Sequence, residues 1–309
     1  MLLKIGIIGA GKVGCSMGKY LSDAGITLAG FYSKSKSSAH EAADFTGTKS
    51  FDTVQELIKA SDTLFLTTPD GALGQVWDCI AKHQLEGKVI CHFSGSLSSD
   101  IFKGIRQTGA SGCSVHPMYA FSDKYTSYRQ LHKAALTMEG DDIALAEMRE
   151  LFGRRMQHRI FTIKTEDKLK YHTAAAFASN YLVGIMDISF SLLQSIGFSQ
   201  EETVSLIKPL SMANMESVFE NGTASSLTGP VERGDYGTVK SHLTVLSDKG
   251  EEGCTCESMA DCGNVCDMNA DYNNFTEVYR SLGMTLVSLA ERRNPDRDYT
   301  SIKKLFLTE

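Results

Sequence analysis

Short apolar runs alternate with segments of helical periodicity through the first half of the chain. Apolar runs bounded by turn residues are typical of buried strands, and apolar spacing of three and four residues is typical of amphipathic helices. The pattern predicts strands at residues 4–8, 28–32, 62–67, 88–93 and 112–117, with edge strands at 134–139 and 159–163. Helices are predicted at 39–45, 54–60, 72–82, 101–107 and 142–152. This alternation indicates an α/β domain with a doubly wound parallel sheet.

The pattern changes near residue 164, after which helical segments follow one another without strands. Helices are predicted at 165–196, 199–221, 237–246, 272–292 and 300–307. We therefore expect two domains, residues 1–164 and residues 165–309, the second of them all-helical. The apolar stretch 173–193 contains Asn180 and Asp187, so a buried helix is expected there rather than a membrane span.

A glycine motif, Gly9-x-Gly11-x-x-Gly14, follows the first predicted strand. Gly9 permits a tight turn, Gly11 leaves room for a pyrophosphate, and Gly14 lets the next helix approach the strand. The N–H groups of that helix would face the phosphates, although glycines that merely pack a turn are the structural alternative. The motif predicts a Rossmann dinucleotide site that includes Ala10, Lys12, Val13, Thr67, Thr68, Pro69 and Ser94.

The end of the second predicted strand indicates which dinucleotide binds. Sites for NAD commonly place an acidic residue there, where it accepts hydrogen bonds from the ribose 2′-hydroxyl. This chain has Ser33, Lys34 and Ser35 followed by further serines and Lys36, without a carboxylate. Cations and hydroxyls suit a 2′-phosphate, so the cofactor is predicted to be NADP, although a solvated loop would read in the same way.

Composition limits the remaining classes of function. The 309 residues are 42% hydrophobic, which is enough for two cores. A net charge of −6 without a long basic run does not fit a nucleic-acid partner. No signal-peptide pattern precedes the first strand, so a cytoplasmic protein without a membrane partner is expected.

Four side chains are candidates for catalysis. Hydride transfer to a carbonyl or imine builds negative charge on the heteroatom, which a proton donor must neutralise. Lys168 and His172 lie about 40° apart around a predicted helix, and Asn180 lies about 80° from His172, at the edge of the same face. His172 is the expected proton donor, with Lys168 orienting an anionic substrate and Asn180 holding a carbonyl oxygen. His116, at a strand end, is the fourth candidate. Three of them have a structural alternative: His172 as a packed imidazole, Lys168 as a solvated lysine, and His116 as a histidine bound to backbone.

Several motifs together resemble a known family. They are Gly9-x-Gly11-x-x-Gly14, Ser94-Gly95, His116-Pro117, Tyr171-His172 through Ser179-Asn180-Tyr181, and Leu227-Thr-Gly-Pro230 through Arg233-Gly-Asp235. Their order resembles the Rossmann-like/DUF2520 proteins over nearly the whole chain. Those proteins are similar in layout to the 6-phosphogluconate dehydrogenase C-terminal-like superfamily, which includes ketopantoate reductases, pyrroline-5-carboxylate reductases and prephenate dehydrogenases. The resemblance implies NADP binding, a helical second domain and dimerisation through it, but no particular substrate.

Two short motifs of this chain can be compared with those of individual members of that superfamily. Ketopantoate reductases place Lys-x-x-x-Asn on the first helix after the Rossmann half, whereas this chain has Lys168-x-x-x-His172. His116-Pro117-Met118 resembles the His-Pro-Met of prephenate dehydrogenases, where the histidine contacts the substrate hydroxyl.

An insertion at residues 249–271 interrupts the helical pattern and holds four cysteines, Cys254, Cys256, Cys262 and Cys266. Four thiolates are enough for zinc or an iron–sulfur cluster. Their spacing is not a standard zinc-ribbon or ferredoxin pattern, so a metal, a thiol-rich loop and local disulfides remain open.

The sequence therefore favours an NADP-dependent oxidoreductase. It is expected to transfer a hydride to or from a small polar metabolite, such as a keto acid or an imine, in a cleft between the domains. A homodimer is expected. The alternative is a catalytically silent NADP(H)-binding sensor or interaction protein, which would need only the N-terminal half.

Overall fold

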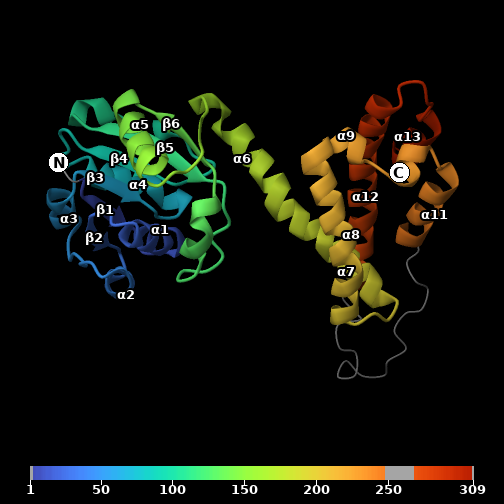
Figure 1. Cartoon of the computed structure of the whole chain (residues 1–309), viewed down its shortest axis with the longest axis horizontal. Coiled ribbons are helices and arrows are strands. Elements are labelled where there is room, and N and C mark those ends of the chain that lie inside the picture. Colours follow the sequence, from blue (N-terminus) through green and yellow to red (C-terminus); the bar gives the residue numbers. More distant parts are fainter. Residues whose placement is uncertain (1–2, 248–267, 308–309) are drawn as a thin grey trace. The chain divides into compact units, whose positions relative to one another are not determined.

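The computed structural model describes residues 3–247 and 268–307, and the chain divides into two compact units, Met1–Tyr181 and Leu182–Glu309 (Figure 1). We call the first the sheet unit and the second the helical unit. The sequence pattern places the domain boundary near Lys164, and the division into compact units falls after Tyr181. Residues 165–181, which carry Lys168 and His172, therefore belong to the sheet unit.

The strands of the sheet unit are β1 Ile5–Ile8, β2 Leu28–Tyr32, β3 Thr63–Leu66, β4 Val89–His92, β5 Ser111–Pro117, β6 Leu136–Gly140 and β7 Ile160–Thr162. Its α-helices are α1 Lys12–Asp23, α2 Lys36–Thr46, α3 Val54–Ala60, α4 Asp70–Ile80, α5 Asp142–Met148 and α6 Lys168–Ala176. The helical unit contains α7 Leu182–Ser195, α8 Gln200–Asn221, α9 Thr223–Ser226, α10 Pro230–Arg233, α11 Tyr236–Ser247, α12 Met268–Arg293 and α13 Thr300–Leu307.

The seven strands form one sheet in the order β2-β1-β3-β4-β5-β6-β7. Neighbouring strands are parallel except β5 and β6, which pair antiparallel. The chain runs from β1 to β2 on one side and then returns to β3 on the other. In open α/β sheets, ligands bind at the carboxyl ends of the strands next to such a reversal. The predicted class, a doubly wound sheet followed by helices, is confirmed.

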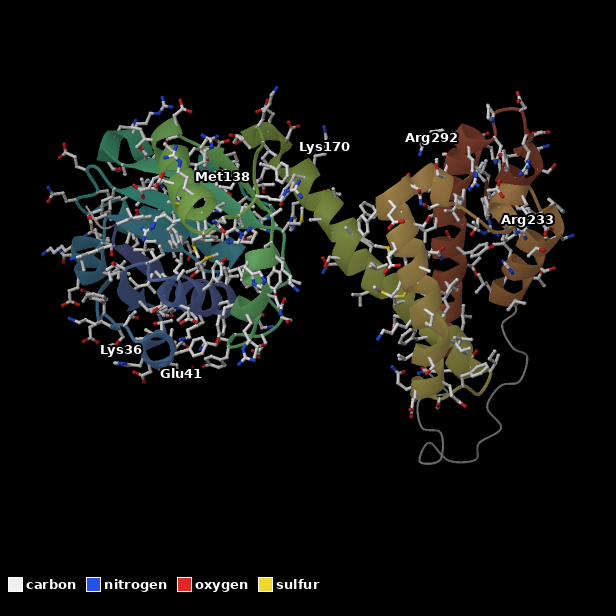
Figure 2. The ribbon with its side chains drawn as sticks, viewed as in Figure 1. Lys36, Glu41, Met138, Lys170, Arg233 and Arg292 are labelled. Carbon is white, nitrogen blue, oxygen red and sulfur yellow. The ribbon has the colours of Figure 1, made fainter. Side chains whose placement is uncertain are left out.

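Alternating residues of the strands supply two separate apolar cores, one on each face of the sheet. Ile5 and Ile7 of β1 pack in the core that also holds residues of α1, α2 and α5 and Met138 of β6, which is labelled in Figure 2. Ile8 packs in the other core, with Trp77 of α4. Because a period of two sends neighbouring side chains to opposite faces, both faces are covered and the sheet's functional surface is its edge of strand ends.

The predicted helix at 101–107 is wrong. Residues 99–108 form two short 3-10 turns, Ser99–Ile101 and Ile105–Thr108. Gly104 separates them with φ +74°, a conformation that cannot continue a right-handed helix.

The single helix predicted at 165–196 is also divided. It begins with a 3-10 turn at Thr165–Asp167, continues as α6, widens into a π-helical segment at Phe177–Tyr181 and resumes as α7. A π-helical turn holds more residues than an α-helical one, so angles counted across this segment do not follow α-helical spacing.

The buried helix expected at 173–193 is not buried by the rest of the chain. The core of the helical unit is built from residues of α10, α11, α12 and α13, and none of its members lies on α7 or α8. Thr165–Ser195 has a mean hydropathy of 1.4 over its most apolar window, and 0% of that window is buried. By length and composition alone this helix could cross a membrane. Its α7 part packs against α8 (Figure 1). Apolar side chains of Thr165–Ser195, such as Leu169 and Val183, are exposed.

Candidate active site

The glycine motif forms the turn between β1 and α1. Gly9 has φ +108°, and a Cβ there would lie 2.9 Å from the backbone of Thr67. A Cβ on Gly14 would lie 2.2 Å from the carbonyl oxygen of Gly9. At Gly11, by contrast, nothing lies within 4 Å of the Cβ position, and the residue caps α1 without a side-chain hydrogen bond. The first and third glycines therefore pack the turn, and the second leaves it open to a ligand.

A cavity of about 860 Å³ begins at this turn. It follows the carboxyl ends of β1, β2 and β3 and reaches Ser94, two residues after the end of β4. Of the predicted cofactor residues it is lined by Gly9, Ala10, Gly11, Lys12, Val13, Ser33, Lys34, Thr67, Thr68, Pro69 and Ser94. Gly14 lies buried beneath the turn, and Ser35 is absent from the lining.

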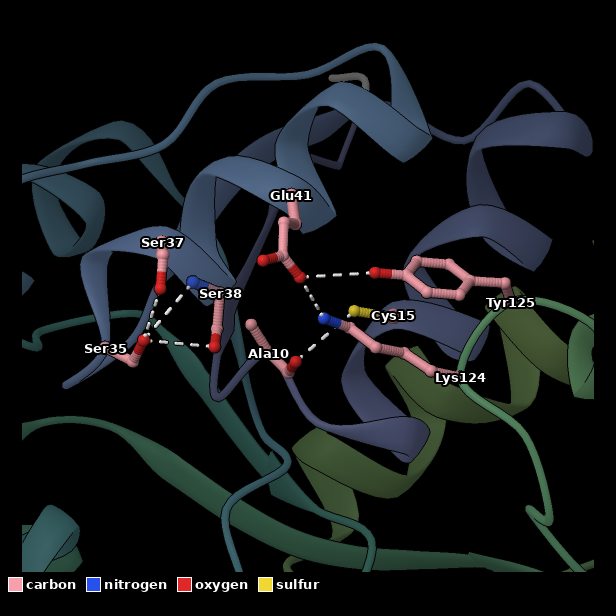
Figure 3. A network of polar contacts seen from close by, with 8 residues as sticks. All are labelled: Ala10, Cys15, Ser35, Ser37, Ser38, Glu41, Lys124 and Tyr125. Carbon is pink, nitrogen blue, oxygen red and sulfur yellow. Dashed lines mark hydrogen bonds and ion pairs between the residues drawn. The ribbon is translucent and has the colours of Figure 1, made fainter.

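The residues of the serine-rich segment after β2 have two different roles. Ser33, Lys34 and Ser38 line the cavity. Ser35 caps α2 by accepting a hydrogen bond from the backbone N–H of Ser38 at 3.3 Å, as Figure 3 shows. Lys36 points away to an ion pair with Asp52 at 2.7 Å. The cations of this segment are therefore not equivalent, because only Lys34 borders the cavity.

A second network holds the segment after β5 against the first two helices. The Lys124 Nζ and the Tyr125 hydroxyl both donate to Glu41 of α2, at 3.0 Å and 3.2 Å (Figure 3). The Ser16 hydroxyl of α1 donates to the carbonyl oxygen of Lys124 at 3.3 Å. Residues shortly after His116 are thereby fixed beside the glycine turn.

Asp70 fixes the loop at the far end of the cavity. Its carboxylate accepts hydrogen bonds from the hydroxyls of Ser94 and Ser96, each at 2.8 Å. The Ser94 hydroxyl in turn accepts from the backbone N–H groups of Ser96 and Leu97, at 3.2 Å and 2.9 Å. Gly95 is held between these contacts.

Two imidazoles converge on Gly95. A Cβ at this position would lie 2.5 Å from Nδ1 of His172 and 2.8 Å from Nε2 of His116, so no larger residue fits without moving a ring. The two ring centroids are 6.1 Å apart. Nδ1 of His116 lies 2.9 Å from the Tyr171 hydroxyl, and Nδ1 of His172 is buried with no hydrogen-bond partner among the described residues. The structure therefore brings His116 and His172 together where the cavity ends.

Lys168 lies in the same region but turns inward. Its side chain is 1% exposed, and its Nζ donates to the hydroxyl of Ser114 on β5 at 2.6 Å. Lys170, two residues on, is exposed on the same helix (Figure 2). Burial lowers the pKa of Lys168 from its usual value. The sequence predicts that Lys168 orients an anionic substrate. An ammonium so enclosed does not do this by direct contact.

Burial also lowers the pKa of the histidines at the strand ends. The pKa of His116 falls from 6.5 to about 4, first by burial and then by the charges of Lys168 and His172. The pKa of His92 on β4 also falls to about 4, mainly by burial. His116 is therefore a neutral imidazole at neutral pH, able to accept a proton at one nitrogen and donate from the other.

Asn180 does not join this group by any hydrogen bond found among the described residues. It is exposed and lies in the π-helical segment, beyond the α-helical part of the predicted face. The sequence prediction gave no role to Tyr171, Ser114, Asp70 or Gly95, although Tyr171 and Gly95 stand in the motifs that carry the family resemblance. Asp70 follows the Thr67-Thr68-Pro69 strand end directly, so its place beside that strand end was a usable signal.

The four cysteines Cys254, Cys256, Cys262 and Cys266 lie outside the described residues. Their possible metal site stays a prediction. Within residues 3–247 and 268–307, no group of three or more His, Cys, Asp or Glu side chains is arranged to hold a metal ion.

The low pKa values predict acid destabilisation of the sheet unit. Between pH 6.5 and about 4 the unfolded chain binds protons at His92 and His116 that the folded chain does not, so the free energy of unfolding falls as pH falls. We expect His92→Gln to reduce this pH dependence by up to about 1.4 kcal/mol per pH unit. The measurement is urea unfolding between about pH 7 and about pH 5.

The single tryptophan, Trp77, is buried in the sheet unit and reports its unfolding by fluorescence. The exposed His132 provides the control variant His132→Gln. An unchanged pH dependence in His92→Gln would contradict the assignment of a neutral, buried imidazole.

Comparisons with known proteins agree with this architecture. Residues 1–117 match the model of the Rossmann-like domain, and residues 134–256 match the model of DUF2520, a domain of unknown function. No curated protein matches the chain.

Solved structures share the fold at low sequence identity. A protein from Bacteroides fragilis, provisionally described as an NADP oxidoreductase, has a TM-score of 0.71 and 19% identity, over 93% of this chain and 98% of that one. A reductive aminase from Aspergillus terreus, in complex with NADPH and ethyl-5-oxohexanoate, has a TM-score of 0.61 and 16% identity, over 99% and 100% of the two chains.

A third solved structure is the pyrroline carboxylate reductase of Plasmodium falciparum with NADP bound. It has a TM-score of 0.55 and 13% identity, over 93% of this chain and 98% of that one. The family models thus identify a Rossmann-like domain at residues 1–117 and a DUF2520 domain at residues 134–256, and the solved structures share the fold of the chain.

Proposed function

We propose that the chain is an NADP-dependent oxidoreductase acting on a small polar carbonyl or imine compound. The observation that carries the proposal is continuity: one cavity runs from the open glycine turn to Ser94, and the next residue, Gly95, is where two imidazoles converge. A dinucleotide site and a pair of proton-transfer groups thus lie end to end within the sheet unit. The cleft predicted between the two domains stays a prediction.

The residues present fit an NADP molecule. The glycine turn and the N-terminus of α1 would hold the pyrophosphate, because Gly11 is open and the first N–H groups of the helix carry no side-chain cap. Ser33, Lys34 and Ser38 would hold the 2′-phosphate, since they line the cavity at the end of β2. A bound nicotinamide would supply or accept the hydride.

His116 is suited to the proton that accompanies such a transfer. Its Nδ1 faces the Tyr171 hydroxyl, and its Nε2 faces Gly95. A neutral imidazole takes a proton at one nitrogen and releases one from the other, so His116 links Tyr171 with the space at Gly95. Nδ1 of His172, without a partner among the described residues, supplies a second donor or acceptor at the same place.

The resemblance of the fold to reductive aminases and pyrroline carboxylate reductases supports imines and keto compounds as substrate classes. The alternative, a silent NADP(H) sensor, requires the cavity alone. The imidazole pair at the end of the cavity favours the enzyme, because a sensor has no need of two buried imidazoles facing one glycine.

The first prediction concerns the 2′-phosphate. We expect Lys34→Ala to weaken NADPH binding by about tenfold while leaving NADH binding unchanged, because it removes one charged contact to the phosphate. Lys36→Ala is the matched control, since Lys36 pairs with Asp52 outside the cavity. Fluorescence titration of the reduced nicotinamide measures both constants. Equal effects of the two substitutions would contradict the assignment.

The second prediction concerns proton transfer. We expect His172→Ala to lower turnover by about 10²-fold or more while the NADPH dissociation constant changes less than about twofold. The measurement is NADPH oxidation against panels of 2-keto acids, imines and aldehydes. His83→Ala, outside the cavity lining, is the control. If the wild-type protein binds NADPH tightly but turns over no compound of the panels, the result favours the sensor.

We propose further that a second copy of the chain covers α7 and α8. Val183 on α7 and Leu210 and Phe219 on α8 are 69%, 62% and 80% exposed, and neither helix contributes to the core of its own unit. Exposed apolar surface of this extent marks an association site. Dimerisation through the helical domain is also what the resemblance implies.

The third prediction tests this dimer. Light scattering after size exclusion should give twice the chain mass for wild-type protein. Leu206→Glu combined with Leu210→Glu should give a monomer, because two buried charges would oppose the interface. Ile143→Glu, a 71% exposed position in the sheet unit, is the control and should remain dimeric. If the wild-type protein is a monomer and sediments with lipid vesicles, the dimer proposal is wrong and the exposed helix binds a membrane.

A further inference from the structure

A buried carboxylate, Glu139, lies next to the candidate site and has no part in the function proposed above. It is 1% exposed and sits on β6, in register with Ser114 on β5. Side chains of residues paired in register stand on the same face of a sheet. Glu139 therefore lies on the same face of the sheet as Ser114, whose hydroxyl accepts a hydrogen bond from the Lys168 ammonium.

Three hydrogen bonds reach the Glu139 carboxylate from two other segments. The backbone N–H and the hydroxyl of Ser99 donate to it at 2.9 Å and 2.7 Å. The hydroxyl of Thr165 donates to it at 3.1 Å. Ser99 ends the loop that carries Ser94 and Gly95, and Thr165 begins the turn that leads into α6. One carboxylate thus joins the loop that carries Gly95 to the turn that leads into the helix of His172.

The same carboxylate acts by its charge on a buried cation, the Lys168 ammonium, without forming an ion pair with it. A buried ammonium without a negative partner loses its proton rather than stay charged. Glu139 raises the pKa of Lys168 against the larger, opposite effect of burial, and among the charges it precedes the contributions of Asp70 and of the two thiols. The titratable groups that influence or are influenced by Lys168 are Glu139 on β6, Asp70 on α4, Cys91 and His92 on β4, and Cys113 and His116 on β5.

We propose that Glu139 is the positioning residue of this site: its carboxylate fastens the Ser94–Ser99 loop and the start of α6 to β6, and keeps the Lys168 ammonium charged near His116. Glu139 acts through Lys168 and touches no reacting atom. Any effect of Glu139 on turnover rests on the proposed oxidoreductase function. The effect of Glu139 on His116 does not, because the charge of Lys168 lowers the pKa of His116 without cofactor or substrate.

Two titrations by NMR test the proposal, that of the Lys168 ammonium and that of the His116 imidazole. Lys168→Met removes the ammonium, so the pKa of His116 should rise by about 1 unit. Glu139→Gln should lower the pKa of Lys168, because it removes a negative charge that favours the ammonium. In the double variant His116 should titrate as it does in Lys168→Met, since the ammonium through which Glu139 acts is already absent.

The pKa of Lys168 separates this role from a purely structural one. Loss of a hydrogen bond alone leaves both charges in place, whereas loss of the Glu139 charge destabilises the ammonium. Thr165→Val is the matched control, because it removes one hydrogen bond to the same carboxylate and leaves both charges in place. It should leave the pKa of Lys168 at the wild-type value.

Two results overturn the proposal. One is a Lys168 pKa that Glu139→Gln leaves at or above the wild-type value. The other is a His116 pKa that Lys168→Met does not raise. If Glu139→Gln fails to fold, the double variant decides: recovery of the fold supports the pairing with Lys168, and failure while Lys168→Met folds shows a need for Glu139 that is independent of the ammonium. Loss of NADPH binding in wild-type protein would defeat the proposed function without changing these titrations.

Discussion

A lysine ammonium enclosed at the end of a parallel sheet is the constraint on which the candidate site depends. Lys168 is 1% exposed and bonded to Ser114. A charge taken out of water is stable only where hydrogen bonds and an opposite charge surround it, and here β5 supplies the hydroxyl and β6 the carboxylate. The start of α6 is thereby fixed on the sheet. Tyr171 and His172 follow one helical turn later and are carried to the strand ends with it.

The enclosed charge also sets the state of the site. Water would screen an exposed lysine, but a buried one acts strongly on its neighbours. It therefore adds to burial in lowering the pKa of His116 to about 4. The result is a neutral imidazole at the end of the dinucleotide cavity. Such a group receives and passes on protons at neutral pH, whereas an imidazolium could only donate.

Much of the fold could be predicted from the sequence, because its signals are local. Each strand of the sheet unit is a short apolar run, and the glycine turn has a motif whose spacing reflects backbone geometry. The predictions failed where local pattern does not determine the outcome. Gly104 divides a segment of helical composition, and a π-helical segment interrupts the long helix before Asn180. The exposed state of α7 depends on which surfaces meet, and periodicity does not report that.

The site could be predicted in part for the same reason. Residues at strand ends, such as Ser94 and His116, meet because parallel strands end at one edge. Glu139, Ser114 and Tyr171 could not be found in this way, because their roles arise from pairing between strands and from the packing of α6 on the sheet. Lys168 shows the limit most clearly: its helical position was evident, but its inward direction follows from partners that lie 54 residues away at Ser114 and on the neighbouring strand.

The central claim is that the nicotinamide end of a bound cofactor lies beside the imidazoles at Gly95. NMR of protein with carbon-13-labelled histidine tests it directly, by adding either NADPH or adenosine 2′,5′-bisphosphate, which lacks the nicotinamide half. The account predicts that both ligands bind, that NADPH shifts the ring resonances of His116 and His172, and that the bisphosphate leaves them in place. Binding of NADPH without a shift of either imidazole would contradict it.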